Sequence, residues 1–110
     1  MPETIKSPSP QISEMVLKAR EAQRIFETFP QSDIDSIVRE IGKYVYDNAE
    51  LLAQMAIEDT GIGNLQDKIT KSRSKSAIIW NNLKGKKSRG IIGENSEKGL
   101  IYIAKPMGVV

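Results

Sequence analysis

The sequence NLQDKITKSRSKSAIIWNNLKG, residues 64–85, carries the clearest structural pattern in the chain. Apolar and small side chains recur there at intervals of four and three residues, which is the spacing of one face of an α-helix. The residues on this face are Leu65, Ile69, Ser72, Ser76, Ile79 and Leu83. Asn64, with Asp67 three residues later, forms a weak N-terminal cap pattern, and Gly85 is a typical helix-ending residue. We therefore predict a helix of about 18 residues, whose small and polar middle would let another backbone pack closely.

Two helices are predicted near the start of the chain. The first begins after Ser13, whose hydroxyl can accept a hydrogen bond from the first turn, and ends before Pro30, which disfavours helical backbone at the preceding residue. The second runs from Ser32 or Asp33 to about Val45. The first helix has one apolar stripe, Met15, Ala19, Ala22, Phe26 and Phe29, and the second is predicted to bury one face, Ile34, Ile37, Val38, Ile41 and Val45.

A third helix is predicted between the second and the stretch quoted above. Asp47 and Glu50 match a capping box, so a new helix starts there and the preceding one does not continue. Its apolar stripe is Leu51, Leu52, Met55 and Ala56. Gly61 suits the position just after the helix end, and Gly61-Ile62-Gly63 is then a turn.

After Lys87 the pattern changes from helical to extended. Two short runs rich in β-branched residues, 89–92 and 100–104, are separated by the polar loop 93–99, which predicts a β-hairpin. Pro106 then breaks the strand, and Met107–Val110 begins another apolar run. Because a strand of this kind needs a pairing partner, we expect the chain to be the front end of a larger protein.

The composition restricts the chemistry that the chain can perform. It has 110 residues, of which 27% are charged and 39% hydrophobic, as in one small soluble domain. There is no cysteine and no histidine, which removes thiol nucleophiles, disulfides, imidazole bases and the usual zinc ligands. No signal peptide or membrane-spanning run is apparent, so a cytoplasmic location is the default expectation.

The net charge of +2 conceals an uneven distribution. Residues 1–67 contain 6 Lys and Arg against 12 Asp and Glu, whereas residues 68–110 contain 10 against 2. The basic block consists of Lys68, Lys71, Arg73, Lys75, Lys84, Lys86, Lys87 and Arg89. Such a block can contact nucleic acid, but it is also typical of a solvated helix face or of a surface that meets an acidic neighbour. Its single aromatic residue, Trp80, lies beside the apolar stripe, which favours a packing role over base stacking.

Other candidate motifs also have plain structural explanations. Adjacent helical residues diverge by about 100°, so Glu58-Asp59 does not converge on one substrate. The pair Asp33 and Asp35 suits the positive end of a helix dipole. Gly61-Ile62-Gly63 lacks both the preceding strand and the later residues of a phosphate-binding loop, and Gly85-Lys86-Lys87 is a turn.

The order of several segments resembles one known family. The segments that resemble the helical N-terminal part of the aldehyde dehydrogenase superfamily are Ala49–Ala53, Glu58–Gly63 and Asp67-Lys68. Those that resemble its coenzyme A-acylating branch are Lys75–Asn81, Lys86–Ile92 and Leu100–Val110. This branch includes acetaldehyde dehydrogenases and acylating succinate-semialdehyde dehydrogenases; Tyr46–Glu50 and Ile79-Trp80-Asn81 are most similar to the latter. The resemblance extends from about Ile12 to Val110.

The resemblance implies an α/β parent enzyme with a dinucleotide-binding domain. Such an enzyme oxidises an aldehyde through a cysteine thiohemiacetal, transfers hydride to NAD(P) and releases the acyl group to coenzyme A. In the family, the cysteine and the loop that approaches the cofactor follow the strand that Gly108-Val109-Val110 resembles. The resemblance therefore places no catalytic, cofactor-binding or metal-binding residue in this sequence. We expect the chain alone to be inactive and to bind neither NAD(P) nor coenzyme A.

The resemblance also predicts a division of the chain into three segments. Residues 1–11 form a flexible N-terminus, residues 12–85 a helical segment that packs on the nucleotide-binding domain of the parent, and residues 86–110 the hairpin with the strand that leads into that missing domain. The hairpin belongs to the strands used for subunit contact, which implies a homo-oligomer. The alternative is an independent module whose basic face binds nucleic acid or an acidic partner.

Overall fold

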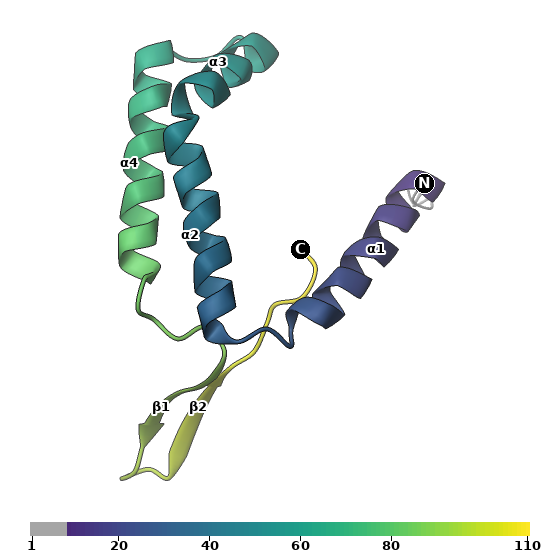
Figure 1. Ribbon diagram of the computed structural model, residues 1–110, viewed down its shortest axis with the longest axis vertical. Coiled ribbons are helices and arrows are strands. Elements are labelled where there is room, and N and C mark those ends of the chain that lie inside the picture. Colours follow the sequence, from purple (N-terminus) through teal and green to yellow (C-terminus); the bar gives the residue numbers. More distant parts are fainter. Residues whose placement is uncertain (1–8) are drawn as a thin grey trace, which may run out of the picture. The chain divides into compact units, whose positions relative to one another are not determined.

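The computed structural model describes residues 9–110 and contains four helices followed by a two-stranded sheet (Figure 1). The elements are α1 (Pro10–Phe26), α2 (Gln31–Asp47), α3 (Ala49–Thr60), α4 (Leu65–Leu83), β1 (Gly90–Asn95) and β2 (Leu100–Ala104). The predicted order of helices and hairpin is confirmed. The chain divides into two compact units, residues 31–87 and residues 1–30 with 88–110. The predicted flexible N-terminus lies, for residues 1–8, outside the described residues.

Helix α1 begins four residues before the predicted start. Ser9, and not Ser13, is the N-cap: its hydroxyl accepts a hydrogen bond from the Ile12 amide at 3.4 Å. Pro10 occupies the first turn, where its fixed φ suits a helix and its missing N–H removes no intrahelical bond. The helix ends at Phe26, and the Phe26 and Phe29 rings then meet edge to face with centroids 5.4 Å apart.

The predicted break between α2 and α3 is confirmed, but the predicted cap is wrong. Asp47 is the last residue of α2, and its carboxylate accepts a hydrogen bond from the Lys43 ammonium at 2.5 Å. Asn48 closes α2 instead, because its backbone and side-chain N–H groups both donate to the Tyr44 carbonyl, at 3.0 and 2.9 Å. Asn48 is also the N-cap of α3, without a side-chain hydrogen bond to that helix.

The turn between α3 and α4 forms as predicted. Gly61 adopts a left-handed conformation with φ 66°, and its amide donates to the Ile57 carbonyl at 2.7 Å. Glycine is favoured at this helix-ending position because, without a Cβ atom, it adopts the left-handed conformation at little cost. Asn64 then caps α4, since its side-chain oxygen accepts a hydrogen bond from the Asp67 amide at 3.1 Å.

The unit of residues 31–87 is held together by α4, which packs against both α2 and α3. Figure 1 shows α2 and α4 running antiparallel alongside each other, with α3 folded across one end. Within residues 9–110, the buried apolar side chains are Ala49 and Ala53 of α3 and Ile69 of α4. Two of these three are alanines, so the core is small and the helices approach closely.

The hairpin pairs β1 with β2 in antiparallel register from Gly90 opposite Ala104 to Asn95 opposite Leu100. The register shifts between Ile91 and Gly93, which is a β-bulge at Ile92. The predicted loop 93–99 is shorter in the structure, because β1 continues to Asn95 and only residues 96–99 form the turn. The Asn95 side chain accepts a hydrogen bond from the Lys98 amide at 3.1 Å and so closes this turn.

Residues 105–110 belong to no helix or strand. The further strand expected at Met107–Val110 stays a prediction, because a strand forms only beside a pairing partner. Of the helices in residues 9–110, none is both long enough and apolar enough to span a bilayer.

Candidate functional site

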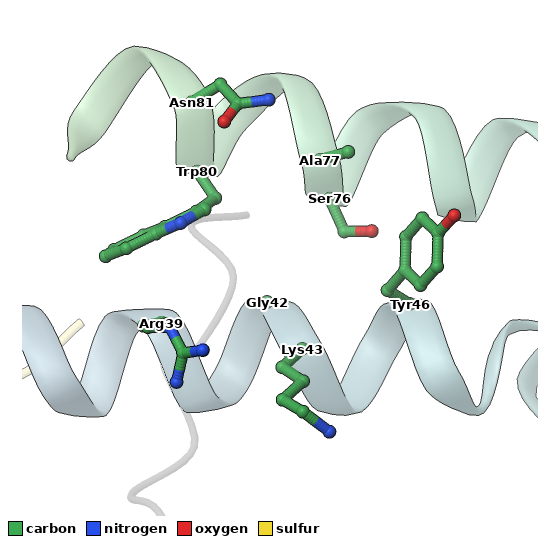
Figure 2. A pocket seen from close by; sticks show the side chains of 8 residues that line it. All are labelled: Arg39, Gly42, Lys43, Tyr46, Ser76, Ala77, Trp80 and Asn81. Atoms are coloured by element: carbon green, nitrogen blue, oxygen red, sulfur yellow. The ribbon is translucent and has the colours of Figure 1, made fainter.

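A groove lies between α2 and α4 in the helical unit (Figure 2). Its volume is about 320 Å3. The groove is lined by Arg39, Gly42, Lys43 and Tyr46 of α2 and by Ser76, Ala77, Trp80 and Asn81 of α4. Figure 2 shows the aromatic rings of Tyr46 and Trp80 at opposite ends, with Gly42 and Ser76 between them.

Small residues line the groove where α2 and α4 approach each other. A Cβ atom placed on Gly42 would lie 3.9 Å from both the Ser76 carbonyl oxygen and the Trp80 Cβ. The Ser76 hydroxyl donates within its own helix, where it lies 2.7 Å from the Ser72 carbonyl and 3.1 Å from the Arg73 carbonyl. The small and polar middle predicted for this helix therefore does face another backbone, and its hydroxyl is already hydrogen-bonded.

The cations of the groove are paired with carboxylates of their own helix. Arg39 contacts Glu40 at 3.1 Å, and Lys43 contacts Asp47 at 2.5 Å. The hydrogen bond that Lys43 donates to Asp47, together with the negative charge of Asp47, raises the pKa of Lys43 above the ordinary value of 10.5. Figure 2 shows the Lys43 side chain pointing away from α4. Because these charges are compensated on the surface, the groove offers little net attraction to an anion.

The carboxylates considered in the sequence do not form a reactive cluster. Glu58 accepts a hydrogen bond from Gln54 at 3.2 Å, and Asp35 accepts one from Gln31 at 2.8 Å, each across one helical turn. Asp33 lies in the first turn of α2 and Asp59 is exposed near the end of α3. Within residues 9–110, no three acidic side chains come close enough to hold a metal ion.

The glycine turn before α4 has the geometry of a helix end and not of a phosphate-binding loop. The Lys68 side chain lies over Gly63, so a Cβ atom there would be only 2.6 Å from the Lys68 Cε. Asn64 already occupies an amide of the first turn of α4, and Asp67 adds negative charge there. An anion at this helix start would have to displace the Asn64 side chain and would face the negative charge of Asp67.

The basic block is spread along α4 and the following loop. Its members are exposed except Lys68 and Arg89, which are half-buried. Arg89 donates a hydrogen bond to the Phe29 carbonyl, which ties the start of the hairpin to the segment that follows α1. Trp80 is half-buried in the groove wall, in agreement with its predicted packing role.

The sequence reasoning missed the α2 side of the groove. Arg39, Lys43 and Tyr46 follow one another at helical spacing, but nothing in that spacing alone predicts which helix they face. The available signal was Gly42. A glycine inside a helix lowers the stability of that helix, so its presence can mark a position where a neighbouring element packs.

No family model matches the sequence, but individual proteins do. The chain is 48% identical over 99 residues to the succinate-semialdehyde dehydrogenase (acetylating) of Clostridium kluyveri. It is 44% identical over 101 residues to the sulfoacetaldehyde dehydrogenase (acylating) of Bilophila wadsworthia. Each match covers 90% of this chain and 22% of the relative, so the chain spans about a fifth of their length.

Solved structures give the same relationship. A probable aldehyde dehydrogenase from Listeria monocytogenes superposes with a TM-score of 0.77 at 33% identity, over 84% of this chain and 20% of the other. An acetylating aldehyde dehydrogenase from Geobacillus thermoglucosidasius gives a TM-score of 0.74 at 36% identity, over 79% and 19%. These similarities confirm the predicted resemblance and do not support the alternative of an independent module whose basic face binds nucleic acid or an acidic partner.

Proposed function

We propose that the chain forms the N-terminal part of a longer acylating aldehyde dehydrogenase, an enzyme that converts an aldehyde, coenzyme A and NAD(P)+ into an acyl-coenzyme A and NAD(P)H. Balanced, this reaction consumes the aldehyde and the free thiol and yields the thioester, the reduced cofactor and one proton. The single observation that carries the proposal is the 48% identity to an acylating enzyme across 90% of this chain.

The chain serves this reaction as structural support and not as its chemical centre. Acyl transfer through a thioester needs a thiolate nucleophile, and these 110 residues contain no cysteine. The groove between α2 and α4 adds no substitute, because its serine hydroxyl is bonded to its own helix and no histidine is present to activate it. The catalytic cysteine therefore has to come from the rest of the enzyme.

The dinucleotide and coenzyme A are also assigned to the rest of the enzyme. Both carry phosphates, which favour free amides at a glycine-rich helix start or unpaired cations. The start of α4 has Asn64 and Asp67 at these positions, and the groove cations are paired with carboxylates. These two places therefore do not fit either group, and no step of the reaction is placed on them.

We further propose that the exposed apolar faces pack on the rest of the enzyme. On α2, Ile41 and Tyr44 are each 61% exposed, and in the hairpin Ile101 and Ile103 are each 58% exposed. Apolar surface of this extent is typical of an interface. The helices would cover the nucleotide-binding domain, and the hairpin would take part in contact between subunits of a homo-oligomer.

A chimeric enzyme tests the proposed function. Residues 12–110 of this chain would replace the matching segment of the Clostridium kluyveri enzyme, with the 110-residue chain alone as control. We expect coenzyme A-dependent reduction of NAD(P) with succinate semialdehyde by the chimera and none by the chain alone. A chimera that assembles normally but has lost more than about a hundredfold in kcat/KM, equal to about 2.7 kcal/mol, would contradict the proposal. Turnover by the chain alone would contradict it as well.

Two variants of the chimera separate packing from chemistry. Ile41→Glu and Ile101→Glu place a charge on the two proposed contact faces, whereas Gln54→Glu places one on the exposed surface of α3. We expect the first two to lower the assembled fraction in size-exclusion chromatography, because a buried unpaired charge is costly. Gln54→Glu should leave both assembly and turnover unchanged. Normal assembly of all three variants would contradict the proposed packing.

The finer assignments rest on similarity alone. Succinate semialdehyde or acetaldehyde is the proposed substrate, because the proteins named above include an acetylating succinate-semialdehyde dehydrogenase and an acetylating aldehyde dehydrogenase. Turnover rates of the proposed full-length enzyme with each aldehyde, and with NAD and NADP in turn, distinguish these choices. A cytoplasmic location stays a prediction.

A further inference from the structure

We draw no further inference here: the strongest candidate, the groove between α2 and α4 with Tyr46 and Trp80 at its ends, has both of its cations paired with carboxylates of their own helix, and nothing in the structure shows what covers it.

Discussion

The helical unit of residues 31–87 and the unit that contains α1 and the hairpin differ in how their apolar side chains are covered. All the buried apolar residues of the described chain, Ala49, Ala53 and Ile69, lie in the helical unit. Helix α1 has no buried residue, and the hairpin isoleucines remain about half exposed. A two-stranded hairpin is marginally stable by itself. The helical unit therefore contains the side-chain packing, whereas α1 and the hairpin are held mainly by local backbone hydrogen bonds.

This difference agrees with the proposal that the chain is one segment of a larger enzyme. A small packed core gives the helices a defined arrangement, and the uncovered apolar faces have the character of contact surfaces. The contrast is testable, because similar substitutions in the two units should have different effects on the stability of the 110-residue chain.

The largest expected effect comes from a charge in the small core. Ala53 is 3% exposed between α3 and α4, so Ala53→Asp buries an unpaired carboxylate. We expect the free energy of unfolding to fall by about 3 kcal/mol, measured by urea denaturation followed by circular dichroism at 222 nm. The matched control is Ala22→Asp on the exposed surface of α1, where lower helix propensity should cost only about 0.5 kcal/mol. Equal losses in both variants would contradict the contrast between the units.

A pair of isoleucines sharpens the same contrast without adding charge. Ile69 of α4 is 7% exposed and Ile101 of β2 is 58% exposed. Replacing Ile69 by threonine should lower the free energy of unfolding by about 2 kcal/mol, because a hydroxyl enters the core and a methyl contact is lost. Ile101→Thr keeps a β-branched side chain on a strand and should change the free energy of unfolding by less than about 0.5 kcal/mol. Thermal melts of the two proteins check this, and a larger loss for Ile101→Thr would show that the hairpin has a core of its own.

Replacing either of two glycines of the helical unit by alanine should change the stability of the chain, but in opposite directions. Gly61 has φ 66° and open space around it, so Gly61→Ala costs about 1 kcal/mol for backbone strain alone. Gly42 lies inside α2, and an added Cβ would make ordinary contacts at 3.9 Å. Gly42→Ala should therefore stabilise the chain by about 0.5 kcal/mol or slightly more. If Gly42→Ala is instead destabilising in the same melts, α2 and α4 pack more tightly than described.

Local patterns in the sequence were sufficient to predict most elements. Helical periodicity gave α2, α3 and α4, and the cap at Asn64 and the turn at Gly61 were predicted because their causes lie within a few residues. The start of α1 was misplaced because two serines compete for the cap, and Pro10 decides between them. The predicted cap at Asp47 does not form, because its carboxylate is paired with the Lys43 ammonium one turn earlier in the same helix.

The groove required information that a single sequence pattern does not contain. Each helix shows which of its faces is apolar or small, but the pairing of α2 with α4 is a tertiary choice. Gly42 and Ser76 were visible as small residues in separate helices, and only the fold brings them together. Apolar periodicity also predicted a buried face on α2, but Ile37 and Ile41 of that face are exposed, because neither α3 nor α4 covers them; its other members, Ile34, Val38 and Val45, are half-buried.

The smallest expected effect is a pH dependence of α2 that should leave the hairpin unaffected. The Asp47 carboxylate raises the pKa of Lys43 above 10.5, so the folded state holds this proton more tightly than the unfolded state. The associated stabilisation is complete below pH 10.5 and is lost as the pH rises through the raised pKa. Because both side chains are exposed, the effect should be slight and should shrink in 0.5 M salt, a condition under which charges are screened within about 4–5 Å. An NMR titration of the lysine Cε resonances checks it: the Lys43 midpoint should fall towards 10.5 in Asp47→Asn. A midpoint in the unmodified chain at or below 10.5 would show that the Lys43–Asp47 hydrogen bond does not persist in solution.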